Sequence, residues 1–368
     1  MTTAILDTAK VEAPFNPAQC LTAVAQAYGK SPMAQVSDFV RLRFGRGKLT
    51  FQEYYQFRLF DDSRYTAAAK KCFVGLKAQE QLYAQHIPMH WRATVGDKIV
   101  FYALFGGLGF PVPHTAALLH PSRSLGEARI LRDSPALEGH LRNSAHYPFF
   151  GKPVAGMYSL GVTLAEAYDS ASDSVVLDGG RKIAVDDFVA ATSEYSANGY
   201  LLQTPLVPHP EMAPYTDNHA STVRLMVFLG NEGPVIFQAL WKIPGRGNIA
   251  DNFWRNGNML AALDIESGRV LRAVRGTGTD QEELQVHPDT GKSLAGFELP
   301  LWQPVTELCR SAAVALPGLP LQAWDIAICP DGPVLVEANI GGDLNLPQIA
   351  SGNGIMDQRL TEFLQTGC

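Results

Sequence analysis

The chain has 368 residues, of which 46% are hydrophobic and 18% are charged, and its formal net charge is -6. A chain of this length can bury a large core, either as one elaborated unit or as two domains that share a cleft. A net negative charge gives no field that would attract a polyanion, so a nucleic-acid partner is excluded. The N-terminus lacks a basic start followed by an apolar core, and no segment has the apolar length needed to span a bilayer. We therefore expect a cytoplasmic protein with no membrane partner.

The helical patterns come first along the chain. Residues 1–90 show no strand-like alternation and contain helical patches, such as AQCLTAVAQAYGK and YTAAAKKCFVGLKAQEQLYAQH. This predicts a helical N-terminal extension. The next stretch, DKIVFYALFGGLGFPVPHTAALLH, predicts a helix from Ile99, a glycine-rich stop at 106–109 and a short extended segment. Residues 91–146 are therefore expected to form a helix, turn and strand unit of an α/β protein.

Strand patterns dominate from Tyr147 onward. The stretch YPFFGKPVAGMYSLGVTLAEAY predicts a strand that ends in Lys152, a loop of small residues, and a return strand or helix. Short apolar segments follow, and the separators GNEGP, IESGR and CPDGP are turn sequences of hairpin type. Consecutive strands joined by tight turns predict an antiparallel sheet, which the amphipathic helix predicted in QPVTELCRSAAVALPG would cover.

Two acids and an amide stand in apolar runs within WDIAICPDGPVLVEANIGGD. If a hairpin closes at CPDG, Asp325 lies on one strand, while Glu337 and Asn339 share a face of its partner; the register decides whether Asp325 joins them. Placing carboxylates close together in a half-buried sheet costs free energy, unless a cation neutralises their charge. Mg²⁺, which prefers oxygen ligands, would turn that cost into a binding site. The alternative left open is an edge-strand Asp325 and a Glu337 paired with an arginine.

Mg²⁺ in proteins is usually bound together with phosphate groups, and two cationic side chains are candidates for binding such a phosphate. Lys152 precedes the small-residue loop 155–161, as a lysine that reaches a nucleotide phosphate would; a solvated lysine at a strand end is the alternative. Arg224 stands in the middle of STVRLMVFL, where an always-charged guanidinium needs anions. It therefore pairs with Glu337 or Asp325, or it clamps a phosphate.

Two further features are open to more than one interpretation. The segment GNIADNFWRNGN contains Asn252 and Arg255 and is either a surface loop or a loop that orients an anionic substrate. His219, just before the arginine strand, is expected in a solvated loop. Reduced thiols are expected for the singly scattered cysteines, which lack CxxC spacing and a neighbouring histidine: Cys20, Cys72, Cys309, Cys329 and Cys368.

Taken in chain order, these motifs resemble the ATP-grasp superfamily and, more closely, its sugar-transfer-associated family. The signatures TVRLMVF, DNFWRNGN with LDIESGR, and WDIAICPDGPVLVEAN carry the resemblance, which covers roughly residues 97–350. It implies an α/β (α+β) ATP-grasp fold, in which two subdomains clasp ATP. The implied parts are a helical extension at 1–90, a pre-ATP-grasp segment at 91–146, a small lid subdomain at 147–202, and a large subdomain with the metal site at 203–368.

The resemblance also implies a role for each candidate residue. One or two Mg²⁺ ions, with Mn²⁺ as a substitute, would bridge the ATP phosphates on three ligands: Asp325, Glu337 and Asn339. The implied catalytic cations are Lys152 on the α- and β-phosphates, Arg224 on the transferred phosphoryl group, and Arg255, which lines the acceptor side with Asn252. The remaining cofactor contacts are expected from Gly156 and Ser159 in the loop and from Gln203, Thr204 and Leu206 in the adenine hinge. This chain departs from many relatives in having Gln203 in place of an acid, and Asn256-Gly257 in place of a double glycine.

The implied activity is that of a Mg-ATP-dependent ligase in the biosynthesis of a small molecule or a cell-surface metabolite. A carboxylate is activated as an acyl phosphate, an amine displaces the phosphate, and catalysis is mainly positioning and charge stabilisation. The first alternative is a phosphotransferase that acts on a sugar or polyol hydroxyl, and the second is a nucleotide-binding protein that has lost catalysis. The expected partners are small-molecule carboxylate and amine substrates, and a homodimer is left open.

Overall fold

The computed structural model describes residue 6 and residues 15–156, 159–357 and 360–362, so Cys368 and two residues of the predicted small-residue loop lie outside the described part. The helices are α1 (Pro17–Tyr28), α2 (Pro32–Arg43), α3 (Phe51–Gln56), α4 (Ala67–Lys70), α5 (Leu76–His86), α6 (Ala93–Gly96), α7 (Lys98–Gly107), α8 (Ser134–Leu141), α9 (Val185–Ser193), α10 (Trp302–Ala313) and α11 (Asn345–Ser351). The strands are β1 (Thr115–Leu119), β2 (Arg129–Leu131), β3 (Phe149–Pro153), β4 (Thr163–Asp169), β5 (Ser174–Leu177), β6 (Lys182–Ala184), β7 (Tyr200–Gln203), β8 (Thr222–Gly230), β9 (Gly233–Ile243), β10 (Met259–Leu263), β11 (Val270–Arg275), β12 (Glu282–Glu283), β13 (Leu321–Cys329) and β14 (Gly332–Ile340).

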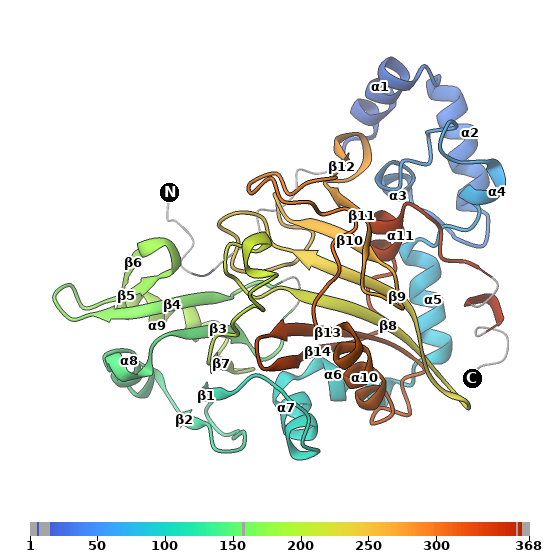
Figure 1. Cartoon of the computed structure of the whole chain (residues 1–368). Coiled ribbons are helices and arrows are strands. Elements are labelled where there is room, and N and C mark those ends of the chain that lie inside the picture. Colours follow the sequence, from blue (N-terminus) through green and yellow to red (C-terminus); the bar gives the residue numbers. More distant parts are fainter. Residues whose placement is uncertain (1–5, 7–14, 157–158, 358–359, 363–368) are drawn as a thin grey trace.

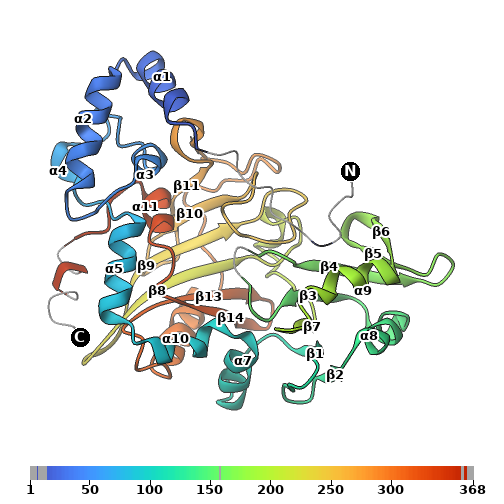
Figure 2. The same cartoon turned by 180° about the vertical axis from the view of Figure 1, so that it is seen from behind.

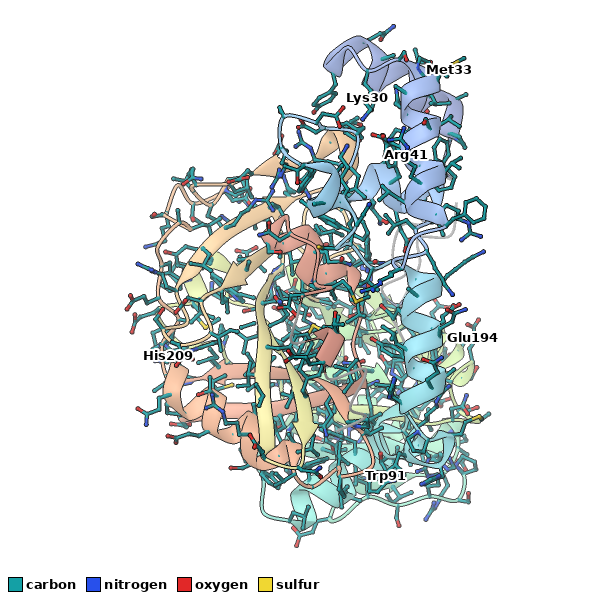
Figure 3. The ribbon with its side chains drawn as sticks, turned by 90° about the vertical axis from the view of Figure 1, so that its right-hand side faces the viewer. Lys30, Met33, Arg41, Trp91, Glu194 and His209 are labelled. Atoms are coloured by element: carbon teal, nitrogen blue, oxygen red, sulfur yellow. The ribbon has the colours of Figure 1, made fainter. Side chains whose placement is uncertain are left out.

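The N-terminal region is helical, as the sequence predicts, and α1 and α2 stand away from the sheets with Met33 on their outer side (Figures 1 and 3). The second helical patch is interrupted, because α4 ends at Lys70 and α5 begins only at Leu76. Tertiary hydrogen bonds take the backbone groups that a continuous helix would use: Val74 N donates to Gln348 Oε1, and Gly75 N donates to Gly47 O. Packing against distant segments therefore overrides the local helical pattern.

A first seven-stranded sheet, called the lid sheet here, has the order β2-β1-β7-β3-β4-β5-β6 and extends to one side of the molecule (Figure 1). The strand expected to end in Lys152 is β3, and its return partner across the loop is the strand β4. Strand β1, from the predicted segment 91–146, pairs antiparallel with β7, with Leu118 opposite Leu201. Helices α8 and α9 cover this sheet, with Phe149 and Phe188 in the shared core. The subdomain boundaries themselves stay a prediction.

A second seven-stranded sheet, the body sheet, has the order β12-β11-β10-β9-β8-β13-β14. The antiparallel hairpins expected at GNEGP, IESGR and CPDGP are present as β8–β9, β10–β11 and β13–β14. Alternation along the strands gives the sheet two buried faces. Trp241 and Trp324 face a core shared with α7 and α10, whereas Leu240 and Leu260 face a core shared with the N-terminal helices and α11 (Figures 1 and 2). The predicted helix in QPVTELCRSAAVALPG is α10, and it covers the first face.

None of the described helices combines the length and the apolar character needed to cross a membrane.

Candidate functional site

The register of β13 with its two neighbours brings the predicted charged residues together. Asp325 stands directly opposite Glu337 on β14 and opposite Arg224 on β8. Residues that are directly opposite share a face of the sheet, so the register, which the sequence left open, places Asp325 on the face of Glu337. Asn339 lies on the same face, and its Nδ2 is 3.4 Å from Glu337 Oε1. This face is opposite to that of Trp324, which is a buried packing residue.

Arg224 pairs with Asp325, which is one of the alternatives that the sequence left open. Its Nε and Nη2 donate to Asp325 Oδ1 and Oδ2, both at 2.7 Å, and Lys242 Nζ donates to Oδ2 at 2.9 Å. Burial disfavours ionisation of Asp325, which is 1% exposed, but the two cations outweigh it and hold the pKa of this carboxyl well below its usual range. The ion pair is therefore fully charged at neutral pH.

Lys242 connects this ion pair to the loop of residues 251–258, called the acceptor loop here because Asn252 and Arg255 are predicted to line the acceptor side. Its Nζ lies 3.3 Å from Asp251 Oδ1, and the other oxygen of Asp251 accepts hydrogen bonds from Thr222 N at 2.7 Å and Thr222 Oγ1 at 2.6 Å. Burial opposes the charge of Lys242, but Asp251 and Asp325 raise its pKa overall. The sequence interpretation missed Lys242, although a lysine inside the apolar run GPVIFQALWKI is the same signal that identified Arg224.

Lys98, the first residue of α7, connects the lid sheet to the body sheet. Its Nζ lies 3.7 Å from Glu337 Oε2 and 3.5 Å from the carbonyl oxygen of Gly156, in the loop between β3 and β4. That loop, called the lid loop here, comprises residues 155–161, of which 157 and 158 are outside the described part. No sequence pattern identified Lys98, because a lysine in the first turn of a helix is ordinarily solvated.

Lys152 is buried at the same junction, so the alternative of a solvated strand-end lysine is wrong. It is 7% exposed, and its Nζ donates to the hydroxyl of Tyr102 on α7 at 2.7 Å. Tyr102 in turn donates to the carbonyl oxygen of Val336, next to Glu337. Burial lowers the pKa of Lys152 to about 8, although Glu337 raises it in part. The Glu337 carboxylate of the body sheet therefore acts on the pKa of Lys152 in the lid sheet.

The predicted hinge begins at Gln203, the last residue of β7, which pairs with β3. The side chain of Gln203 is buried and turned into the lid sheet, where its Nε2 donates to Thr115 Oγ1 at 3.0 Å. Thr204 is exposed and bonds through its backbone N to the carbonyl oxygen of His114, whereas Leu206 is half-buried. Because the Gln203 side chain is engaged within the sheet, a contact from it to adenine is not favoured, and the hinge contacts stay a prediction for the backbone.

The predicted acceptor loop reaches the lid loop. Arg255 Nη2 donates to the carbonyl oxygen of Ser159 at 2.6 Å, and Arg255 is buried. Asn252 Oδ1 accepts a hydrogen bond from Trp254 N at 3.3 Å, which shapes the turn. The structure thus places Arg255 against the lid loop, while the roles of Arg255 and Asn252 toward an acceptor stay predictions.

His219 makes a second contact between the two sheets. Its Nε2 lies 3.1 Å from Asp178 Oδ1, in the turn η3 (Asp178–Gly180) that follows β5, and its side chain is only 10% exposed. The expectation of a solvated loop histidine was wrong, because the lid sheet covers this residue.

The donor atoms fit a hard cation only in part. Among the described residues, no group of three or more histidine, cysteine, aspartate or glutamate side chains is arranged to hold a metal ion. Glu337 and Asn339 offer oxygen atoms of the kind that Mg²⁺ prefers, and the Glu337 side chain is 30% exposed. Both oxygens of Asp325 already accept hydrogen bonds from cations, so Asp325 fits a metal only if Arg224 and Lys242 move to another anion.

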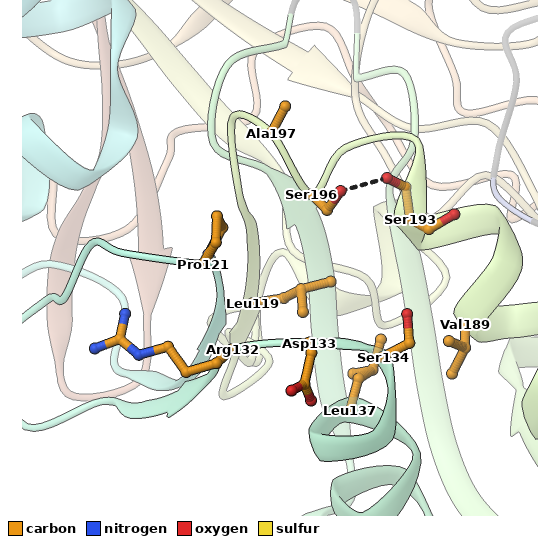
Figure 4. A pocket seen from close by; sticks show the side chains of 10 residues that line it. All are labelled: Leu119, Pro121, Arg132, Asp133, Ser134, Leu137, Val189, Ser193, Ser196 and Ala197. Atoms are coloured by element: carbon orange, nitrogen blue, oxygen red, sulfur yellow. Dashed lines mark hydrogen bonds between the residues drawn. The ribbon is translucent and has the colours of Figure 1, made fainter.

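A cavity of about 250 Å³ lies elsewhere, within the lid sheet region between β1, α8 and the end of α9 (Figure 4). Its polar side chains serve local structure: Asp133 caps α8 through Ala136 N, and Arg132 Nη1 donates to the carbonyl oxygen of Arg123. None of the predicted site residues lines this cavity.

Comparison with solved structures finds, among others, two ligases and a synthetase, all at low identity. D-alanine–D-alanine ligase from Bacillus anthracis in complex with ATP is 12% identical over 79% of this chain and 74% of that chain, with a TM-score of 0.41. L-amino acid ligase from Bacillus licheniformis is 12% identical over 78% of this chain and 52% of that chain, with a TM-score of 0.41. The ADP complex of N5-carboxyaminoimidazole ribonucleotide synthetase is 13% identical over 70% of this chain and 50% of that chain, with a TM-score of 0.38.

No curated protein sequence shows significant similarity to the chain. The model of one protein family does match it, from residue 77 to residue 364, which is well over half of its length. The match includes α5, the lid sheet, the body sheet and the cluster of Arg224, Asp325 and Glu337. The chain belongs to the sugar-transfer associated ATP-grasp family.

Proposed function

We propose that this protein is a Mg-ATP-dependent ligase that activates a carboxylate as an acyl phosphate and joins it to an amine. The observation that carries the proposal is a group of four cations around Asp325 and Glu337, three of which contact one of these two carboxylates. Lys152 comes from the lid sheet, Lys98 from α7, and Arg224 and Lys242 from the body sheet. A polyphosphate bound where the lid loop meets β13 and β14 would lie close to these cations, because Lys98 contacts both the lid loop and Glu337, which stands directly opposite Asp325.

The nucleotide phosphates would change the partners of this cluster. In the structure, Arg224 and Lys242 neutralise Asp325. When phosphate oxygens enter, the two cations can bind them, and the released Asp325 carboxylate can join Glu337 and Asn339 as an oxygen ligand. A bound Mg²⁺ ion would neutralise charge on the phosphates. Mn²⁺ would be expected to substitute for it at the same oxygen ligands.

The proposed reaction needs no covalent bond between the protein and its substrates. A carboxylate substrate attacks the γ-phosphorus, the bond to the bridging oxygen breaks, and ADP leaves with the electron pair. An amine then attacks the acyl carbon, a C–N bond forms and phosphate leaves. Arg224 and Lys152 would stabilise the negative charge that develops on the transferred group, and Arg255 would hold the lid loop closed over it. This fits a site made of cations and carboxylates.

The test uses the full-length protein with ATP, Mg²⁺, a broad panel of carboxylic acids and hydroxylamine. Hydroxylamine attacks acyl phosphates, so a ligase should release ADP and form a hydroxamate with at least one acid. Absence of both products across the panel would overturn the proposal. Arg224→Met should abolish product formation, whereas Lys182→Met, which changes an exposed lysine of the lid sheet, should leave it unchanged.

The same assay separates the two alternatives. A phosphotransferase would give ADP and a stable phosphorylated sugar or polyol in place of a hydroxamate, which ³¹P NMR distinguishes from free phosphate. A protein that binds nucleotide without catalysis would show ATP binding by calorimetry and no ADP under any condition.

A further inference from the structure

A half-buried carboxylate lies just beyond the charged cluster, in the segment that follows β14. Asp343 comes after Gly341 and Gly342, which both have positive φ and turn the chain back toward the sheet. Asp343 Oδ2 accepts a hydrogen bond from the indole Nε1 of Trp254 at 3.3 Å, and Oδ1 accepts one from Asn345 N at 2.9 Å. No lysine, arginine or histidine nitrogen of the described residues lies within 4 Å of this carboxylate, unlike that of Asp325.

The neighbouring amide adds a second acceptor that has no donor. Asn345 Oδ1 is buried and has no hydrogen-bond partner, while the rest of the residue is partly exposed. A buried carbonyl oxygen without a donor is uncommon in folded proteins, since leaving it unsatisfied is costly. Asp343 and Trp254 are only half-buried, so a small ligand can reach these two side chains, whereas the Asn345 oxygen comes within reach when that side chain rotates.

The N-terminal helices fix this arrangement. Tyr83 of α5 donates its hydroxyl hydrogen to the carbonyl oxygen of Gly342 at 2.6 Å, and Gln79 Oε1 accepts a hydrogen bond from Leu344 N at 2.8 Å. The loop that holds Trp254 is anchored separately, through Asp251 and Lys242. Three distant parts of the chain therefore meet around Asp343: helix α5, the loop 251–258 and the segment after β14.

The site lies within electrostatic reach of the reaction centre. Burial raises the pKa of Asp343, and the Arg224 cation lowers it in part. A carboxylate that is partly desolvated and has no cation in contact would gain from a positively charged ligand. An ammonium group has three N–H donors and no acceptor, and it binds well over an indole ring.

We propose that Asp343, Asn345 Oδ1 and the indole of Trp254 form the binding site for a primary ammonium group, which is carried by the acceptor substrate. The inference rests on the proposed ligase function and defines the class of its second substrate: a primary amine that enters the site as a cation and gives one proton to the Asp343 carboxylate before its nitrogen attacks the acyl carbon. The carboxylate accepts one N–H, the amide oxygen accepts another, and the ring covers the charge.

The experiment compares two nucleophiles in wild type and in Asp343→Asn. Hydroxylamine is uncharged at neutral pH and reacts with an acyl phosphate without an ammonium site, whereas amino acids, ethanolamine and putrescine are cations. Asp343→Asn should keep hydroxamate formation at saturating hydroxylamine and lose about 10- to 100-fold in kcat/KM with the amine that wild type uses, since a charge-assisted hydrogen bond is removed. Asp331→Asn, which changes an exposed acid in the β13–β14 turn, should leave both reactions unchanged.

Two results in this comparison would overturn the inference. Equal losses with hydroxylamine and with the amine would place Asp343 at the nucleotide end, and no loss with either would remove it from the site. Circular dichroism melting checks that Asp343→Asn folds.

A binding measurement keeps the inference testable if wild type gives no hydroxamate with any acid, which would be a failure of the proposed function alone. Titration of the full-length protein with ethanolamine or putrescine should change tryptophan fluorescence in wild type, not in Asp343→Asn, and less in Trp254→Phe. An identical response in wild type and Asp343→Asn, or no response in wild type, would overturn the ammonium site.

Discussion

Arg224 and Asp325 form two hydrogen bonds of 2.7 Å each across neighbouring strands, and Lys242 adds a third at 2.9 Å to the same carboxylate. The carboxylate is therefore shared by two buried cations. Because each partner is desolvated, the pair is stable only while its members neutralise one another. In the proposed function, Arg224 and Lys242 would exchange this carboxylate for phosphate oxygens.

Asp325→Asn should strongly destabilise the protein in the absence of ligands. The change leaves Arg224 and Lys242 close together without their shared anion, and breaking a buried ion pair in this way costs about 3–5 kcal/mol. Urea unfolding followed by circular dichroism measures the loss.

Lys242→Met is the matched control for that prediction. Asp325 keeps its two bonds to Arg224 in this variant, so the loss of stability should be clearly smaller. A larger loss for Lys242→Met than for Asp325→Asn would contradict the view that Asp325 is the centre of the cluster. The double variant should lose less than the sum of the two single variants, because both act on one network.

The lowered pKa of Lys152 predicts that the free energy of unfolding depends on pH. Burial lowers its pKa in the folded protein to about 8, compared with 10.5 when it is free in solution. Between these values the unfolded chain binds more protons than the folded chain, so raising the pH favours folding. Below pH 8 the cost of the buried cation is present in full, at about 3 kcal/mol.

Lys152→Met should therefore melt at a higher temperature than wild type at pH 7, and the difference should shrink as the pH rises from 8 to 10. Differential scanning calorimetry across this range measures it. Lys182→Met, which removes a lysine that is 55% exposed, should show no such trend. A difference for Lys152→Met that stays constant with pH would show that folding does not lower the pKa of Lys152.

The hairpin that carries Asp325 and Glu337 could be predicted from the sequence because it depends on local rules. The turn CPDG sets where the strands reverse, but regular pairing from that turn would place Asp325 opposite Val336. A register shift between Asp325 and Ile326, which no local pattern predicts, brings Asp325 opposite Glu337. The same rules located β8–β9 and β10–β11. The family signatures added the fold as a whole, since they follow the order of these strands.

The remainder of the site depends on contacts that no local pattern encodes. Lys98 and Tyr102 lie on a helix whose sequence indicates only a buried apolar face, yet they meet Glu337 and Lys152 of two different sheets. Asp343 stands at the end of the stretch that the sequence singled out, but its partner Trp254 is 89 positions away. The orientation of Gln203 is likewise decided by a neighbouring strand, through Thr115.

His219 and Asp178 should act as one contact that holds the lid sheet against the body sheet. Removing either side chain deletes the same hydrogen bond, so His219→Ala and Asp178→Ala should each speed amide hydrogen exchange in residues 174–184 to a similar extent. Mass spectrometry of the exchanging peptides measures this. Asp186→Ala changes an exposed acid of α9, whose ion pair to Arg142 at the end of α8 does not involve His219, and should leave the exchange unchanged. Faster exchange in only one of the two variants would contradict a shared contact.

Lys98 should contribute to nucleotide binding because it touches both the lid loop and Glu337. Lys98→Met removes a positive charge from the junction between the lid loop and β14, and it leaves Glu337 without its nearest cation. The negative charge that repels incoming phosphates therefore increases. We expect KM for ATP in the ADP-release assay to rise about 10-fold, which corresponds to about 1.4 kcal/mol. Lys98→Arg keeps the charge and should recover most of the affinity, whereas Lys182→Met should resemble wild type. If Lys98→Met and Lys98→Arg are equally impaired, the size of the side chain and not its charge is what the junction requires, and Lys98 holds the lid loop in place instead of binding the nucleotide.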